Sequence, residues 1–283
     1  MKKFLYIIGI LATFASCNDL DDNERFTYVE PARPTQPDQP GLAERYILLE
    51  DYTGQLCPNC PKAVPVIDQL HELYGDNVIA VGIHGGRCLD NVVSGVEIEL
   101  GFATSESKAY YEAAGSPAQP SGRINRKGTP ATIDRWRTLA DAEFSTMATF
   151  SLEITTNYEA PGRTATVNVA AKGLSGSNTG KLQLWIVEDH IVAPQSQPDG
   201  SMTMEYIHNH VFRASVNGTW GEDFAIAENE TKTYTATATL KSYWKPENIS
   251  IVAFVYNDSG VLQAAKAKLQ TTPQQSEEET NKE

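Results

Sequence analysis

Cysteine and basic residues are both scarce in this chain. Four cysteines among 283 residues are too few for the dense disulfide framework of small secreted domains. Lys and Arg number 23 against 36 Asp and Glu, which gives a formal charge of −13. Without a basic excess we expect no nucleic-acid partner. Hydrophobic residues make up 41% of the chain, which excludes a wholly disordered protein.

Apolar runs long enough to span a membrane are also missing. The run Phe4–Ala15 is shorter than the ~20 residues that a membrane-spanning helix needs. It follows Lys2 and Lys3, and this layout is typical of a secretory signal peptide. We therefore assign residues 1–16 to a signal peptide and leave them out of the fold.

The signal ends in a motif that predicts a lipid anchor. Phe14-Ala15-Ser16-Cys17 resembles a bacterial lipobox, although Phe14 stands where leucine is usual. The resemblance implies that Cys17 is lipidated and becomes the mature N-terminus in the outer membrane, facing the periplasm or the cell surface. Residues 17–41 then form a tether.

The tether is acidic at first and proline-rich later. The acidic stretch 18–24 is either a solvated spacer or, by resemblance, the export signal of surface lipoproteins in Bacteroidetes-type bacteria. Prolines at every third position from Pro31 to Pro40 favour an extended, semi-rigid chain. The polar residues 272–283 predict a disordered tail.

Between residues 42 and 148 strand and helix patterns alternate. Apolar strands are predicted at 45–52, 78–83 and 122–125, and helices over 62–74, around 105–114 and after Thr132. This order is typical of an α/β domain. From 149 to 271 the pattern changes to short alternating strands separated by Gly, Asn, Ser and Pro, which predicts a second, all-β domain of the sandwich type.

The motif that bears chemistry is Cys57-Pro58-Asn59-Cys60, between a strand and a helix. In this context CxxC indicates a redox pair. A helix N-terminus stabilises a thiolate, so we expect Cys57 to be exposed and acidic and Cys60 to be more protected. A zinc site and a purely structural disulfide are the alternatives, but the second CxxC that zinc commonly uses is missing.

The stretch 47–83 resembles the start of a thioredoxin-like domain. Pro65 stands where that family has a helix-kinking proline, and Asp51 matches its buried acid, which accepts the proton of the resolving thiol. Glu50 is the adjacent candidate. Leu56 replaces the family's usual aromatic residue. The resemblance also implies a cis-proline facing the CxxC, for which Pro120 is the best match and Pro117 the competitor.

The mature chain also resembles a narrower group, the 28-kilodalton outer-membrane lipoprotein family of Bacteroidetes. The likeness covers roughly residues 45–270 and is carried by 48–61, by Gly122–Arg126 and by Tyr206–Glu222. It implies a thioredoxin-like domain in front and a β-rich domain behind, with an undefined activity and surface or adhesin-like roles for some members.

Other thiols and imidazoles carry less weight. Cys88 is interpreted either as a buried, unreactive cysteine or as a third reactive thiol. His84 closes a strand and is interpreted as structural. His208 and His210 are predicted to share one face of a strand, but without a third ligand we expect no metal. We expect no cofactor either.

Three functions therefore remain open. The first is thiol–disulfide exchange on extracytoplasmic proteins, with Cys57 attacking, Cys60 resolving, and Asp51 and Pro120 assisting. The second is a non-catalytic surface-binding lipoprotein in which Cys57–Cys60 is a structural disulfide. The third is a scaffold subunit of an envelope complex.

The lipid anchor is testable directly. We expect Cys17→Ser to release the protein into the soluble envelope fraction, because acyl chains supply the membrane affinity. Fractionation followed by immunoblotting measures this. Unchanged partition of the variant into the membrane fraction contradicts lipidation.

Overall fold

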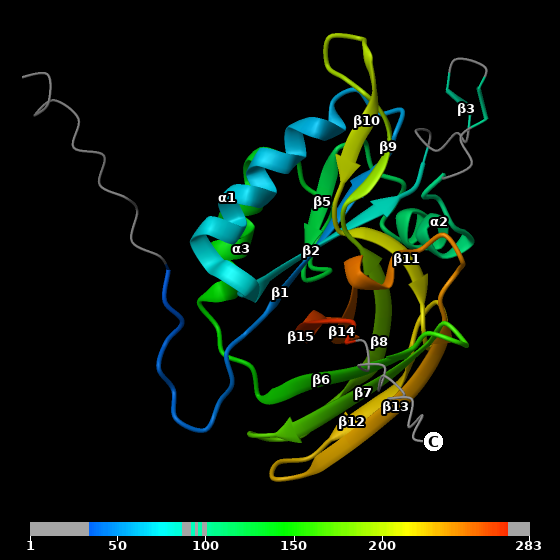
Figure 1. Cartoon of the computed structure of the whole chain (residues 1–283). Coiled ribbons are helices and arrows are strands. Elements are labelled where there is room, and N and C mark those ends of the chain that lie inside the picture. Colours follow the sequence, from blue (N-terminus) through cyan, green and yellow to red (C-terminus); the bar gives the residue numbers. More distant parts are fainter. Residues whose placement is uncertain (1–33, 87–91, 94–95, 98–100, 271–283) are drawn as a thin grey trace, which may run out of the picture. The chain divides into compact units, whose positions relative to one another are not determined.

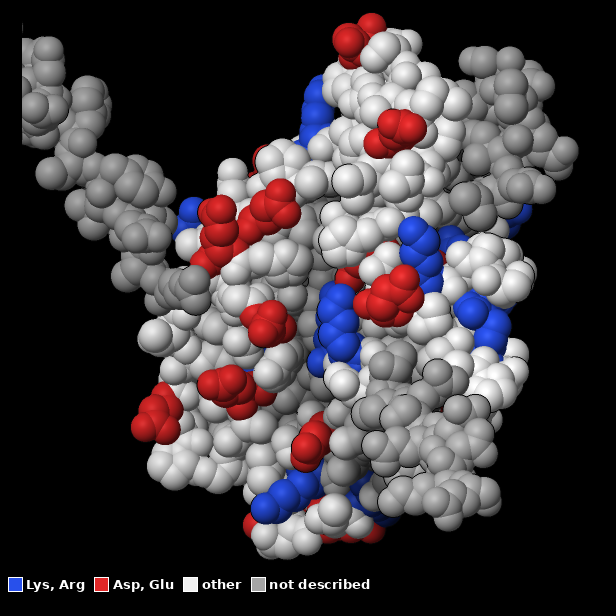
Figure 2. Space-filling view, viewed as in Figure 1, with Lys and Arg blue, Asp and Glu red and all other residues white. Residues whose placement is uncertain are grey.

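The computed structural model of this chain describes residues 34–86, 92–93, 96–97 and 101–270 (Figure 1). The predicted signal peptide, Cys17, residues 17–33 of the tether, Cys88 and the tail 272–283 lie outside the described residues. On the face drawn in Figure 2 acidic and basic side chains are interspersed.

The centre of the fold is a sheet of eight strands that draws on both halves of the chain. β1 pairs in parallel with β2, and antiparallel with β5. β2 also pairs with β11, and β12 pairs with the first part of β8. The strands of this sheet are β1 (Ile47–Thr53), β2 (Val78–His84), β5 (Ser121–Ile124), β8 (Asn178–Glu188), β11 (Val211–Ser215), β12 (Glu222–Ile226), β14 (Ile249–Asn257) and β15 (Gly260–Lys268).

Helices cover both faces of the sheet around β1. α1 (Val64–Tyr74) and α3 (Trp136–Phe144) pack on one face through a core that includes Ile47, Leu49 and Trp136. α2 (Ser105–Ala113) packs on the other face, where its Tyr110 joins a second core. The short 3₁₀ helices are η1 (Cys60–Ala63), η2 (Gly75–Asn77), η3 (Ile133–Arg135) and η4 (Pro246–Asn248).

A second sheet packs on the later part of the first. Its strands, in spatial order, are β13 (Thr231–Thr239), β7 (Thr164–Gly173) and β6 (Phe150–Glu159). Alternate residues of β7, from Ala165 to Ala171, are fully buried and meet residues of β8 and β14 in a third core. The alternating pattern after residue 149 therefore reflects strands with one buried and one exposed face.

Two hairpins stand apart from these sheets. β9 (Ile191–Ser196) and β10 (Met202–His208) form a two-stranded ribbon directly before β11. β3 (Val92–Val93) and β4 (Val96–Glu97) form a minimal pair. Figure 1 shows the β9–β10 ribbon beyond the end of β2 and near the start of α1.

The expected elements are largely present, but the expected division is not. The helices begin after one-turn 3₁₀ segments, α1 at Val64 and α3 at Trp136, and α2 lies where it was expected. The mixed α/β and strand-rich composition is confirmed. The prediction that 42–148 and 149–271 pack as two independent units is wrong. Strands from both ranges share one sheet, and residues 34 onward form one compact unit. The change of pattern near 148 marks local structure and not separate packing.

None of the helices in the described ranges is long and apolar enough to cross a membrane.

The shared sheet predicts that the halves do not fold separately. A fragment of residues 34–148 loses β11 beside β2, and Phe212 and Phe254 from the core that covers Leu48 and Tyr52. We expect this fragment to aggregate or remain unfolded, and residues 34–270 to unfold in one transition. Circular dichroism during urea titration measures both. A soluble, cooperatively folded 34–148 fragment contradicts the prediction.

Candidate functional site

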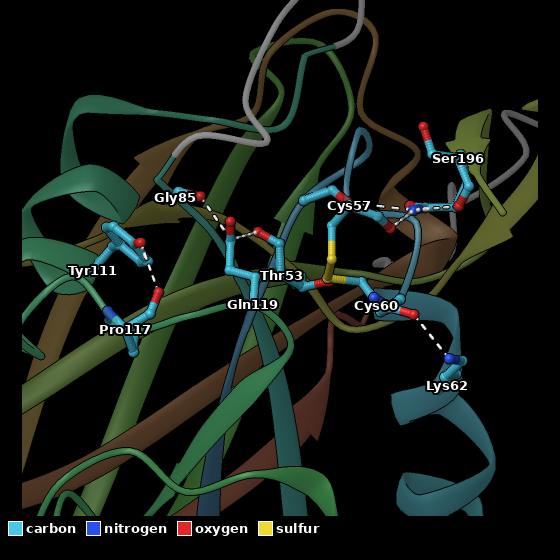
Figure 3. Close-up of a disulfide and its surroundings, with 12 residues drawn as sticks. Thr53, Cys57, Cys60, Lys62, Gly85, Tyr111, Pro117, Gln119 and Ser196 are labelled. Carbon is cyan, nitrogen blue, oxygen red and sulfur yellow. Dashed lines mark hydrogen bonds between the residues drawn. A yellow bond between two sulfur atoms is a disulfide. The ribbon is translucent and has the colours of Figure 1, made fainter. Parts of the chain in front are cut away.

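Cys57 and Cys60 form a disulfide at the end of β1 (Figure 3). β1 ends at Thr53, and a short loop then leads to Cys57. The Cys57 carbonyl accepts a hydrogen bond from the Cys60 N–H, at 3.3 Å, which folds the motif into a turn. Cys60 begins η1, which leads into α1 with Pro65 in its first turn.

The predicted exposure of Cys57 is wrong. Cys57 is 2% exposed and Cys60 is 4% exposed, so both sulfurs are shielded from solvent. Cys57 also lies ahead of η1, and the α-helix begins only at Val64. The helix N-terminus is therefore further from Cys57 than the sequence pattern suggested, and its dipole, which acts within about one turn, favours a Cys57 thiolate less.

The cover over the disulfide comes from the β9–β10 hairpin. The Gln195 side-chain amide, itself buried, donates hydrogen bonds to the Cys57 carbonyl at 3.0 Å and to the Gly54 carbonyl at 3.3 Å. The Ser196 N–H donates to the Gln55 carbonyl at 2.8 Å, and the Gln55 amide donates to the Pro194 carbonyl at 3.1 Å. Figure 3 shows Ser196 beside Cys57. The hairpin thus closes the site with direct bonds to the loop that carries the motif.

Asp51 lies behind the disulfide. It shares with Cys60 a cavity of about 70 Å³, and its Oδ1 atom is buried without a hydrogen-bond partner among the described residues. Burial raises the pKa of the Asp51 carboxyl to about 7. The carboxyl can therefore exchange a proton near neutral pH, which suits an acid–base role.

Glu50 does not reach this cavity. Successive side chains of a strand point to opposite faces. Glu50 accordingly accepts a hydrogen bond from Arg126 Nε, at 2.9 Å, and another from the Tyr52 hydroxyl, at 3.1 Å. Of the two adjacent acids, only Asp51 faces the disulfide side.

Pro120 follows a cis peptide bond, as the thioredoxin-like resemblance implied. The Gln119–Pro120 peptide bond is cis, and among the described residues no other cis bond is found. The next residue, Ser121, pairs with Tyr52 at the end of β1. The Gln119 amide donates to the carbonyls of Thr53, at 2.5 Å, and Gly85, at 2.7 Å, and Figure 3 shows it beside the disulfide. Pro117 instead accepts a hydrogen bond from the Tyr111 hydroxyl.

Two imidazoles line the same cavity as Asp51. His84 and His208 each contact the Phe102 ring edge to face, with ring centroids 4.9 and 4.8 Å from it. Burial, aided by neighbouring positive charge, lowers the pKa of His84 to about 3, and burial lowers the pKa of His208 to about 4. Both are therefore neutral at pH 7, and the His84 Nδ1 and His208 Nε2 atoms lack partners in the described part of the chain.

The prediction that His208 and His210 share one face of a strand is wrong. His208 ends β10, whereas His210 lies in the turn before β11 with a φ of 49°, so the two do not share a strand face. His210 faces Asp189 at 3.7 Å. No group of three potential ligands that could hold a metal ion occurs within the described ranges.

Sequence reasoning missed Gln195 and His208 as parts of the site. Gln195 is separated from Cys57 by 138 positions, and nothing in the local pattern of β9 connects them. His208 was visible in the sequence, but its role depends on the hairpin folding back over β2.

Parts of this chain are similar to known proteins in sequence and in structure. Residues 107–273 match the family model described as "Outer membrane protein Omp28". HBP35 of Porphyromonas gingivalis is similar in structure, with a TM-score of 0.63 and 15% identity over 85% of this chain and 81% of that one. A domain of the outer membrane lipoprotein Omp28 from the same organism is 26% identical, with a TM-score of 0.34, over 45% of this chain and 93% of that one. The comparison with curated proteins gives no match.

The raised pKa of Asp51 predicts a pH-dependent stability. The native state holds this proton up to about pH 7, whereas the unfolded state releases it near pH 3.8. Its contribution to the free energy of unfolding is therefore complete below about pH 4 and is lost as the pH rises to about 7, a change of about 4 kcal/mol. We expect Asp51→Asn to remove this loss. The free energy of unfolding of the variant should therefore rise relative to that of the wild type between about pH 4 and pH 7.

Urea unfolding of the disulfide-bonded protein from pH 4 to pH 8 measures the difference. Comparison with the wild type at each pH cancels the opposing titration of His84 and His208, whose lowered pKa values destabilise the native state in acid. Asp134→Asn, at an exposed position, is the matched control. Parallel stability curves for the wild type and Asp51→Asn contradict a raised pKa at Asp51.

Proposed function

Because the chain belongs to the Omp28 family of outer membrane proteins, we propose that it is an outer-membrane lipoprotein that exchanges thiols and disulfides with extracytoplasmic proteins. Lipid on Cys17 anchors it, since two or more acyl chains give stable attachment. Residues 42–148 contribute a thioredoxin-like part and residues 149–271 a sandwich-like part of the single folded unit.

The observation that carries this proposal is the buried carboxyl of Asp51 beside Cys60. A carboxyl buried without full hydrogen bonding destabilises a protein. A disulfide that only staples the chain needs no such group behind it. A resolving thiol does, because it must lose its proton before it can attack.

The exchange proceeds in two steps. The Cys57 thiolate attacks one sulfur of a partner disulfide, which forms a mixed disulfide and releases the partner's other sulfur as a thiolate. Cys60 then passes its proton to Asp51 and attacks Cys57, which yields the Cys57–Cys60 disulfide and a partner that has gained two electrons. The same steps in reverse oxidise a partner dithiol. A dithiol or disulfide protein of the envelope restores the starting state in either direction.

Access to Cys57 requires the β9–β10 hairpin to move. Gln195 binds the carbonyl of Cys57, and Ser196 and Pro194 bind Gln55 of the same loop. Release of these bonds exposes the disulfide and frees backbone groups of residues 54–57. An extended partner segment can then pair with those groups in place of the hairpin.

The burial of both sulfurs favours a second candidate function. If the hairpin stays closed, Cys57–Cys60 is a structural disulfide in a non-catalytic surface-binding lipoprotein. The exposed fractions of 2% and 4% support this alternative as directly as Asp51 supports exchange. The two differ in whether a partner can reach Cys57.

Trapping separates the two functions. We expect Cys60→Ser to accumulate mixed disulfides with envelope proteins, because Cys57 attacks but no second thiol resolves the product. Cys57→Ser is the matched control and should trap at least about tenfold less, because Cys60 is the resolving thiol. Non-reducing electrophoresis of alkylated envelope extracts, followed by mass spectrometry of the captured proteins, measures this.

Equal trapping by both variants, or none by either, contradicts the exchange proposal and favours the alternative in which Cys57–Cys60 is a structural disulfide. Cys57→Ser/Cys60→Ser shows the background in the same extracts. The urea stability of each variant, measured in parallel, establishes that differences in trapping do not arise from unfolding.

A further inference from the structure

A second cavity lies on the opposite face of β1 from the disulfide. Its volume is about 230 Å³, and its lining includes Glu50 and Tyr52 of β1, Tyr110 of α2, and Tyr256 at the end of β14. Because side chains alternate along β1, Asp51 faces the disulfide while Glu50 and Tyr52 face this cavity. None of its lining residues belongs to the exchange site.

The cavity holds a guanidinium with free hydrogen-bonding capacity. The Arg126 side chain is 10% exposed, and its Nε donates to Glu50. The second oxygen of Glu50 accepts from the Tyr52 hydroxyl, so this carboxylate has an assigned partner at each oxygen. The Nη1 and Nη2 atoms of Arg126, which carry four of its five N–H donors, bond to no residue in the described part of the chain.

A second arginine repeats this pattern. Arg123 is the cross-strand neighbour of Glu50 and also lines the cavity. Its Nε atom is buried without a partner among the described residues. Buried donors of this kind are rare because each one left unpaired is costly. Glu50 and Asp258 balance the charge of the two arginines in the lining, but unused N–H donors of both arginines remain.

The Arg126 guanidinium lies over the faces of tyrosine rings in the cavity wall. The Arg126 guanidinium carbon lies 4.4 Å from the ring centroid of Tyr256 and 5.7 Å from that of Tyr110. The polar atoms of these rings are already bonded, since the Tyr110 hydroxyl donates to the Thr219 carbonyl and the Tyr256 hydroxyl donates to the Trp220 carbonyl. The hydroxyls of these two rings are therefore not free to bind a ligand.

Trp220 forms the mouth of the cavity. It is 46% exposed, and its ring meets that of Tyr110 edge to face, with centroids 5.3 Å apart. An exposed tryptophan held against a buried aromatic wall is a ready platform for stacking a ring.

We propose that this cavity is a binding site for a small aromatic carboxylate. The guanidinium of Arg126 binds the carboxylate, for which its paired N–H groups have the matching geometry. The ring of the ligand packs between the aromatic walls and Trp220. The volume is below the roughly 300–1,000 Å³ of pockets for drug-sized ligands, which limits the ligand to about one ring and its acid group.

Benzoate tests the site in the intact protein, with calorimetry as the readout. We expect saturable binding of benzoate that is about tenfold tighter than that of acetate, which lacks the ring, or benzyl alcohol, which lacks the charge. Glucose, as a neutral polar ligand, should not bind. Equal affinity for benzoate and acetate, or binding of glucose in place of benzoate, overturns the proposal, as does the absence of saturable benzoate binding.

Two variants locate the binding in the cavity. Arg126→Lys keeps the charge but loses the paired donors, and Trp220→Ala removes the mouth at a position that is partly exposed; each should weaken benzoate binding about tenfold. Tyr243→Ala, which removes an exposed aromatic ring elsewhere, should not change it. If Arg126→Lys fails to fold, Trp220→Ala carries the test alone. Wild-type affinity in Trp220→Ala overturns the assignment.

The proposal is independent of thiol–disulfide exchange. Cys57→Ser/Cys60→Ser should bind benzoate with wild-type affinity, because the two sites lie on opposite faces of β1. A loss of binding in this double variant, at unchanged stability, contradicts the separation of the sites.

Discussion

A short hydrogen bond marks the point where strands from the two parts of this protein join in one sheet. The Gly82 N–H of β2 donates to the His210 carbonyl at 2.7 Å, and next to it Val211 of β11 pairs with Gly82. Through this junction the strands around the disulfide become part of the same sheet as the strand-rich half. Because β11 follows directly after the β9–β10 hairpin, the junction also fixes where the hairpin can lie. The cover over Cys57 is a consequence of this pairing.

Side chains of β1 alternate between the two faces of the sheet, so the strand contributes to two different sites. Its apolar residues serve different cores, with Leu49 toward α1 and α3 and Leu48 toward α2. The two acids at its centre follow the same alternation, so Asp51 lies with the disulfide and Glu50 with Arg126. One strand with two adjacent acids therefore supports two unlike environments, an isolated carboxyl whose pKa is raised and a carboxylate held by an arginine.

Local features of this fold could be predicted from sequence, and long-range ones could not. The strand at 78–84 and the helix at 64–74 follow from apolar spacing that is decided within a few residues. The cis bond at Pro120 and the position of Asp51 followed from a family resemblance. The burial of Cys57 depends on Gln195, 138 positions away, and the setting of Arg126 depends on Glu50, 76 positions away. No local period encodes such contacts, and the predicted boundary near 148 failed for the same reason.

The hairpin hydrogen bonds have a kinetic consequence. A thiol can attack the disulfide only in molecules whose hairpin is open, so the observed rate is the product of the open population and the intrinsic rate of attack. When opening and closing are fast, every attacking thiol is slowed by the same factor. When attack outpaces closing, the rate becomes independent of thiol concentration and equals the opening rate. A partner that itself binds the open hairpin, for instance through the outward pair Val192 and Ile207, escapes this common limit, and selectivity then resides in the motion of the ribbon instead of in the sulfur chemistry.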